Sequence, residues 1–314
     1  MHPAFSVIFF TTASGAGYGL LALLGVLGPA GVIPAERWFG LAALALALGA
    51  VSLGLLSSTF HLGHPERAWR ALTQWRSSWL SREGVAAIVT YAPAGLFAIG
   101  WVFLERNDGL WGFFGVGTAM MSAVTVGCTA MIYRSLKPIH QWHNGFVLPA
   151  YLALALVTGA LWLNALLHLF GLGHWAVTAT ALAATAAGWA IKAAYWWFID
   201  TNAAISTPNT ATGLRTGRVR LIDAPHTEDN YLLKEMGYRV ARKHAAKLRL
   251  VAHGTAFALP LVLTAATAAL PPVLAAGAAL LAAASVSLGV VVERWLFFAE
   301  ARHAVTLYYG AEAA

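Results

Sequence analysis

The sequence predicts an all-α, polytopic integral membrane protein: a single bundle of eight transmembrane helices. Of its 314 residues, 59% are hydrophobic and only 11% are charged, whereas a soluble domain has about 45–50% apolar and about 25% charged residues. The apolar runs are continuous and about 20 residues long, which is the length that a spanning helix needs. A membrane β-barrel would instead show alternating segments of about ten residues, so that class is excluded.

The predicted spans form one membrane domain over residues 1–314. They lie at about residues 5–28, 38–60, 85–104, 110–133, 146–168, 175–198, 251–270 and 273–298. The first span lacks a preceding Lys or Arg and a clear small-residue cleavage site, so we expect a retained helix rather than a signal peptide. It holds the small residues of Ser14–Gly19, which favour close helix packing. A cofactor loop there is not expected, because no strand precedes it.

The basic residues predict the orientation. Of the 20 Lys and Arg residues, 18 fall on one side of the predicted spans, and only Arg37 and Arg106 fall on the other. Because basic residues collect in cytoplasmic loops, we expect both termini and the three basic connections to lie in the cytoplasm of a bacterial cell whose inner membrane holds the chain. The net charge of +7 therefore does not indicate nucleic-acid binding.

Residues 200–250 form the longest connection, a cytoplasmic loop. Its first half, from Ser206 to Gly217, is rich in turn-forming residues and is expected to be irregular. Its second half, from about Glu228 to Leu250, mixes apolar and basic residues. This pattern predicts an amphipathic basic helix on the membrane surface or under a docked protein.

The densest polar cluster runs from Ser57 to Arg70, from the last turn of span two onto the cytoplasmic surface. Pro65 suits the first turn of a short interfacial helix. Where span three begins, Ser81 is expected to cap the helix and Glu83 to lie at its positive N-terminus. The hairpin is therefore expected to bring His61 and Glu83 to the same depth.

This cluster suits a quinone headgroup. Ionisable groups at the membrane edge of a bundle indicate function, and each quinone carbonyl needs a hydrogen-bond partner and a proton supply. The candidate quinone-binding residues are His61, Glu83, Arg67, His64 and Arg70. The alternative is structural: a capping carboxylate, an interfacial histidine, and arginines that contact lipid phosphate.

A second polar cluster, from Tyr133 to Asn144, lies on the same side. It either completes a site or ends two helices. Its His140 and His143 make a poor metal site without carboxylates, and we expect no metal ligands in the chain. The single Cys128 excludes a disulfide framework, a thiolate zinc site and a self-ligated iron–sulfur cluster.

Two other classes compete with a quinone site. A bis-histidine haem needs histidines within the spans, but the histidines fall at or outside the span ends, so no haem is expected. A secondary transporter would favour charges or broken helices near the midplane. The sequence offers mainly Ser, Thr and Gly there, with Asn164 and the near-end Lys192 and Glu293.

Three stretches carry a resemblance to a known family: Met1–Phe10, His61-Leu62-Gly63-His64-Pro65-Glu66-Arg67-Ala68, and Ala224–His244. Over essentially its whole length the chain resembles the membrane anchor subunits of the DMSO reductase family (DmsC-like). The resemblance implies an anchor without haem that holds an iron–sulfur (ferredoxin-like) subunit, which connects to a molybdopterin subunit. It also implies exchange of electrons with ubiquinone or menaquinone, at a site whose residues match His61, Glu83 and Arg67 here.

The predicted cytoplasmic position of His61 departs from the DMSO-reducing members, whose quinone motif faces the periplasm. In this respect the chain looks more like the anchor of the cytoplasm-facing sulfite dehydrogenases (SoeC-like). We therefore expect an anchor that is catalytically silent alone and passes electrons from sulfite to quinone, the alternative being a quinol-oxidising anchor. Besides membrane lipid, its protein partners are expected to dock on Arg134, Lys137, His140, Arg239, Arg242 and Lys243.

Overall fold

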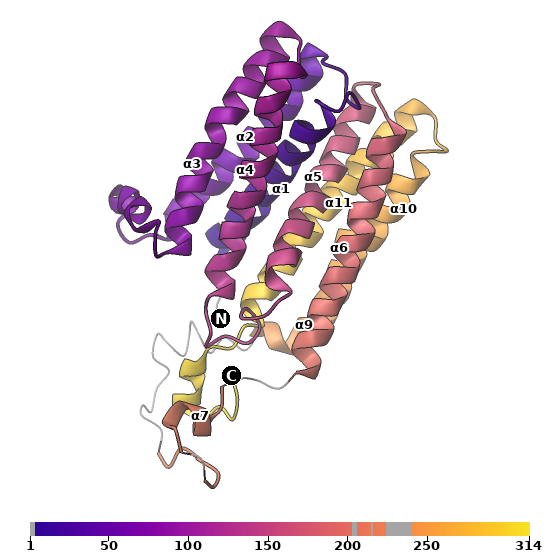
Figure 1. The fold of residues 1–314 in the computed structure, drawn as a ribbon. Helices are drawn as coiled ribbons and strands as arrows, with labels where there is room; N and C mark the ends of the chain where they lie inside the picture. The colour runs from indigo at the N-terminus through magenta and orange to yellow at the C-terminus, as the bar shows by residue number, and fades with distance from the viewer. Residues whose placement is uncertain (1–3, 203–205, 215, 224–239) are drawn as a thin grey trace.

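The computed structural model describes residues 4–202, 206–214, 216–223 and 240–314, and for residues 61 and 240–242 it describes the backbone only. The long helices run along one common direction as a bundle, and both ends of the chain lie at the same end of that bundle (Figure 1). We call it the terminal end. The described residues contain helices, turns and irregular segments but no strand, which confirms the all-helical class.

Seven helices in the described part are long and apolar enough to cross a membrane. Their bounds are Phe5–Leu27, Arg37–Phe60, Trp79–Phe103, Gly109–Arg134, Val147–Leu169, Lys243–Ala266 and Pro272–Ala299. In Figure 1 they carry the labels α1 (Phe5–Leu27), α2 (Arg37–Ser57), α3 (Trp79–Ala98), α4 (Gly109–Arg134), α5 (Val147–Leu169), α9 (Val240–Ala252) with α10 (Leu259–Ala266), and α11 (Pro272–Ala299).

The sixth predicted span corresponds to α6 (Trp175–Thr201), a helix of 27 residues. It packs beside α5 and α10 (Figure 1), yet it is not among the seven. Lys192 and several threonines make it less apolar than its neighbours. An eighth span therefore stays a prediction.

Two of the predicted spans begin earlier than the apolar runs indicate. The third begins at Trp79 rather than near Val85, and its last turns, Ile99–Phe103, are a π-helix. The seventh is one continuous helix from Val240, through a π-helical stretch at His253–Ala258, to Ala266. The described part of the basic helix is thus the extension of a spanning helix rather than a separate element.

α1 lies at the centre of the bundle, against α2, α4, α5 and α11. Its glycines allow this close packing: a Cβ on Gly17 would lie 2.5 Å from the Ala47 carbonyl oxygen, and one on Gly19 only 1.8 Å from the Ala155 carbonyl oxygen. Small residues let helix backbones approach one another in membranes. The expectation of close packing at Ser14–Gly19 is confirmed.

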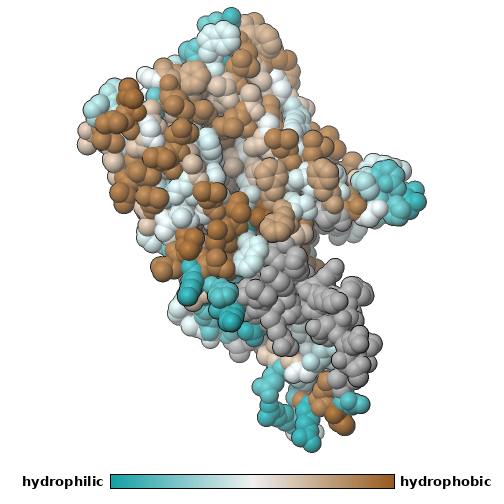
Figure 2. All heavy atoms as spheres, turned by 180° about the vertical axis from the view of Figure 1, so that it is seen from behind, coloured by the Kyte–Doolittle hydropathy of each residue, from teal (hydrophilic) through white to brown (hydrophobic). Residues whose placement is uncertain are grey.

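The surface pattern fits a membrane protein. Figure 2 shows hydrophobic residues over the sides of the bundle and hydrophilic ones gathered at its ends. Exposed tryptophans near helix ends include Trp38, Trp69 and Trp175, as in the aromatic belt of membrane proteins. A largely apolar lateral surface is stable in lipid, where no hydrophobic force drives it inward.

The first half of the long connection is more regular than its turn-rich sequence indicates. Residues Pro208–Thr212 form a short helix, α7, which begins with reciprocal hydrogen bonds between Thr207 and Thr210. It packs against the 3-10 helix Ala304–Tyr309 of the C-terminal tail. The amide of Ala314 also donates to the Ser206 carbonyl oxygen at 3.0 Å. These tertiary contacts order a segment that composition alone marks as irregular.

Candidate functional site

The hairpin between α2 and α3 carries the predicted quinone-binding residues. α2 continues as a 3-10 turn, Ser58–His61, and a 3-10 helix follows at Pro65–Gln74, with Pro65 in its first turn as expected. The Ser81 hydroxyl donates to the Ala71 carbonyl oxygen and so joins this short helix to α3. The expected capping role of Ser81 is therefore wrong: Ser78 is the N-cap residue of α3.

The predicted residues on the short 3-10 helix face outward. His64 and Arg67 are exposed and lie 3.0 Å and 3.7 Å from the carboxylate of Glu66. The Arg70 guanidinium lies 5.6 Å from the ring centre of Trp69. Arginine–tryptophan pairs of this kind suit the water–lipid boundary.

Glu83 is separated from that exposed group. Only 4% of Glu83 is exposed, and its Oε1 accepts a hydrogen bond from the Thr129 hydroxyl of α4. In the described residues no ion pair joins it to Arg67 or Arg70. Of His61 the structure gives the backbone position, at the end of the 3-10 turn. Glu83 lies beyond the first turn of α3, a turn that begins at Trp79 and holds no acidic residue, so its expected place at the helix N-terminus is wrong. It is a buried acid between α3 and α4.

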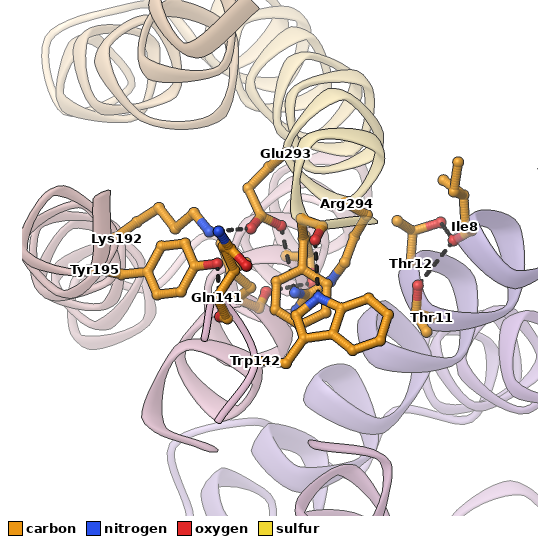
Figure 3. A network of polar contacts seen from close by, with 12 residues as sticks. Ile8, Thr11, Thr12, Gln141, Trp142, Lys192, Tyr195, Glu293 and Arg294 are labelled. Carbon is orange, nitrogen blue, oxygen red and sulfur yellow. Dashed lines mark hydrogen bonds and ion pairs between the residues drawn. The ribbon is translucent and has the colours of Figure 1, made fainter. Parts of the chain in front are cut away.

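A second group of charges joins α6 to α11. Lys192 of α6 places its Nζ 2.5 Å from Oε1 of Glu293 in α11, and Arg294 Nη1 lies 3.5 Å from the other carboxylate oxygen. The three residues are 1%, 0% and 2% exposed. Figure 3 shows Lys192 and Glu293 pointing toward one another from their two helices. We call this group the buried charge cluster.

Aromatic rings complete the surroundings of the buried charge cluster. The Lys192 ammonium lies 3.8 Å from the ring centre of Tyr195, and the Arg294 guanidinium lies 3.6 Å from that of Tyr151. Ring faces attract cations, so they partly replace the lost hydration. With two cations and one anion, the cluster carries a net positive charge when all three are ionised.

A small polar cavity lies beside the buried charge cluster. Its lining includes Arg294, Tyr151 and Thr129, the residue whose hydroxyl donates to Glu83. In the described part of the chain, neither the Tyr151 hydroxyl nor Nε of Arg294 has a hydrogen-bond partner. A larger, mainly apolar cavity of ≈ 250 Å³ adjoins it between α1, α2, α5 and α11.

The connection between α4 and α5 closes the terminal end of the bundle. Trp142 Nε1 donates to the Phe297 carbonyl oxygen at 2.9 Å, and the Tyr195 hydroxyl donates to the Gln141 carbonyl oxygen at 3.1 Å (Figure 3). His140 is buried and stacks on Phe198, with ring centres 5.6 Å apart. Burial lowers the pKa of His140, because it disfavours the charged ring.

A cavity of ≈ 380 Å³ opens beside this connection. Arg249 of α9 spans it, with contacts of 2.6 Å to Asp200 and 2.8 Å to Glu300. Burial raises the pKa of Glu300, although the nearby Arg249 opposes this. The cavity is lined by His140, Gln141, Ile199, Asp200, Asn202, Ala245, Arg249, Glu300 and Arg302. We call it the terminal cavity.

The residues predicted to dock a partner differ in how far they are exposed at the surface. Lys137 and Lys243 are exposed at the terminal end and Arg134 is half-buried. The buried ring of His140 is not part of the exposed surface. Arg239 and the side chain of Arg242 lie outside the described residues.

The sequence marks Lys192 and Glu293 as polar residues near span ends but does not predict that they pair. The available signal was an ionisable residue in each of two apolar runs, at similar distances from the terminal end. Ionisable residues within spans pair with one another. Their pairing still depends on α6 and α11 coming together, which no local pattern specifies.

Comparison with known proteins identifies the family. The family model described as DMSO reductase anchor subunit (DmsC) matches residues 1–310. The chain belongs to the DmsC family. The resemblance based on the His61–Ala68 block and the two flanking stretches is thereby confirmed.

Three named relatives are similar to this DmsC-family protein. The C subunit of the sulfite dehydrogenase of Allochromatium vinosum is 32% identical over 98% of this chain and 99% of its own length. Two Escherichia coli K12 proteins, both named as parts of an anaerobic dimethyl sulfoxide reductase, match smaller parts. The YnfH protein is 25% identical over 38% of this chain and 41% of its own length, and the C component of the reductase is 25% identical over 40% and 44%.

Proposed function

We propose that this DmsC-family protein is the membrane anchor of a molybdopterin/iron–sulfur oxidoreductase complex and carries its quinone-reactive site. The observation that carries the proposal is the whole-length match to the C subunit of a sulfite dehydrogenase. The matches to the dimethyl sulfoxide reductase proteins extend over less than half of this sequence. We therefore favour electron flow from sulfite to quinone over a quinol-oxidising role.

The residues of the α2–α3 hairpin suit quinone chemistry. Reduction of a quinone takes two electrons and two protons. The single Cys128 cannot ligate an iron–sulfur cluster, so the electrons come from a partner subunit. Glu83 is a buried acid that can hold a proton near the ring, and a histidine such as His61 is a residue type that can both accept and donate a proton. Arg67 and Arg70 are exposed on the hairpin. Their side chains would have to turn inward to contact a bound quinone ring.

Charge supports the proposed orientation and docking face. The terminal end holds exposed Lys137, Lys243 and Lys247, and positive residues favour the cytoplasmic side. We place both termini, the hairpin and the docked iron–sulfur subunit on that side of the bacterial inner membrane. An acidic patch on the iron–sulfur subunit would complement this basic surface, and complementary charges guide the association of two proteins.

The buried charge cluster also suits a secondary transporter, the rival function, because transporters keep paired charges inside the membrane. A transporter would purify alone and move a solute in liposomes without a redox partner. The DmsC family match over residues 1–310 favours the anchor.

The test compares His61→Ala and Glu83→Gln complexes with wild type. We expect each to reduce quinone at least about 100-fold more slowly, since a positioned acid–base group contributes about 10²–10⁴-fold. Each quinone-linked rate is divided by the dye-linked rate of the same preparation. The dye-linked rate is the turnover of the soluble partner subunits with an artificial electron-carrying dye in place of quinone. His174→Ala is the matched control, because His174 precedes α6 at the opposite end of the bundle. Equal loss of the quinone-linked and dye-linked rates would make both residues structural and reject the site.

A further inference from the structure

We propose that the buried Lys192–Glu293 pair is a proton relay between the terminal cavity and Glu83. The inference rests on the proposed quinone chemistry, for which it supplies the route of the protons. It assigns a role to two helices, α6 and α11, that hold none of the predicted quinone-binding residues.

The pair is an improbable feature to retain for stability alone. Lys192 and Glu293 are 1% and 0% exposed, with their charged atoms 2.5 Å apart. Removing two charges from water costs more than their attraction returns in many proteins, and apolar replacements are then neutral or stabilising. Ionisable residues inside a membrane domain therefore mark function, including proton relays.

The outer end of the relay opens to the terminal cavity. Glu300 lines that cavity and lies seven residues after Glu293 in the chain. Two helical turns place both acids on similar faces at the end of α11, about 10 Å apart along its axis. Glu300 Oε2 is buried, and no described residue hydrogen-bonds to it. The raised pKa of Glu300 lets this carboxylate take up protons closer to neutral pH than an ordinary glutamate does.

The inner end reaches Glu83 through the polar cavity. Arg294, which follows Glu293 in the chain, lines this cavity together with Tyr151 and Thr129. The cavity has a volume of ≈ 10 Å³, which is about the space that one water molecule needs. It is therefore too small for a quinone ring but suits a bridging water. The Thr129 hydroxyl then donates directly to Glu83.

The relay moves protons without any redox change of its own. A proton from the terminal cavity passes to Glu300 and then, by way of water across the roughly 10 Å that separates the two acids along the helix axis, to the Glu293 carboxylate. It continues through the Tyr151 hydroxyl, a bridging water and the Thr129 hydroxyl to Glu83, which delivers it to a quinone oxygen. Two such transfers balance the two electrons that the iron–sulfur partner supplies. Arg294 keeps its own proton, and Lys192 and Arg294 favour return of Glu293 to its charged form.

The experiment uses the intact complex, with quinone reduction driven by a reduced viologen dye so that no substrate protons interfere. Two variants are compared: Glu293→Gln, and the double variant Lys192→Met with Glu293→Gln, which conserves the net charge of the buried charge cluster. Ser287→Ala is the matched control, because Ser287 is also on α11 and bonds to Trp162 instead. The measured quantities are kcat and KM for quinone and the ratio of kcat in light and heavy water.

We expect kcat for quinone reduction to fall at least about tenfold in both variants, with KM unchanged and a larger solvent isotope effect. Ser287→Ala should leave all three values unchanged. The relay is rejected if the double variant turns over at the wild-type rate, or if KM rises while the isotope effect stays constant. A wild-type complex that reduces no quinone would instead overturn the proposed function itself, and the relay with it.

Discussion

Replacing Gly19 by alanine should separate the two central helices of the bundle. The added Cβ would lie 1.8 Å from the Ala155 carbonyl oxygen, about 1.6 Å short of the 3.4 Å at which ordinary contact begins. Both atoms belong to rigid helices, so no side-chain rotation relieves the overlap. Gly159 faces Gly19 across the same contact, so α5 cannot shift locally without moving as a whole.

Overpacking a core costs about 1–3 kcal/mol, and more where the backbone itself must move. We therefore expect Gly19→Ala to lose about 3 kcal/mol or more, which corresponds to about 6–12 °C in a melting curve of a large domain. The assay is thermal unfolding of the purified protein in mild detergent. Gly15→Ala is the control, because a Cβ there meets nothing within 4 Å and alanine favours helix over glycine. Equal melting temperatures for the two variants would refute the helix packing described here.

Two further predictions concern the connection between α4 and α5. Trp142→Phe should cost about 1–3 kcal/mol, because it leaves the buried Phe297 carbonyl oxygen without its donor; Trp38→Phe, at a tryptophan that is 65% exposed, should melt like wild type. For His140, the lowered pKa means that its stabilising contribution is present above the unfolded-state pKa of about 6.5 and is lost as the pH falls from there toward the folded pKa. The melting temperature of wild type should therefore fall more between pH 7.5 and pH 5.5 than that of His140→Phe, in which the new ring still stacks on Phe198. An equal fall in the two proteins would contradict this.

The helical class, the close packing of α1 and the turn at Pro65 could be predicted from the sequence, because each depends on local composition or spacing. The residues at which helices begin could not be predicted from the apolar runs alone. Trp79 begins α3 earlier than its apolar run, since the polar residues of its first turn bond across the hairpin. Apolarity alone marks the lipid-crossing stretch of a helix and not where its hydrogen bonding begins.

The candidate site depends on tertiary contacts that spacing does not encode. The sequence predicts that Glu83 lies beside the α2–α3 hairpin, but its burial depends on packing against Thr129, which lies 46 residues further along the chain. Likewise, Arg67 sits in the same motif as His61 yet pairs with its neighbour Glu66 at the surface. The pairing of Lys192 with Glu293 joins helices about one hundred residues apart, and periodicity within one helix carries no information about its partner.

The proposed function requires this protein to link a metal-containing partner to quinone. The most direct measurement is to purify the tagged protein from its native membrane in mild detergent, determine its molybdenum and iron content and visible spectrum, and follow quinone reduction on addition of sulfite. We expect molybdenum, broad iron–sulfur absorption without a haem band, and sulfite-dependent reduction of quinone. A colourless protein that purifies without partners and leaves quinone oxidised would contradict the proposed function.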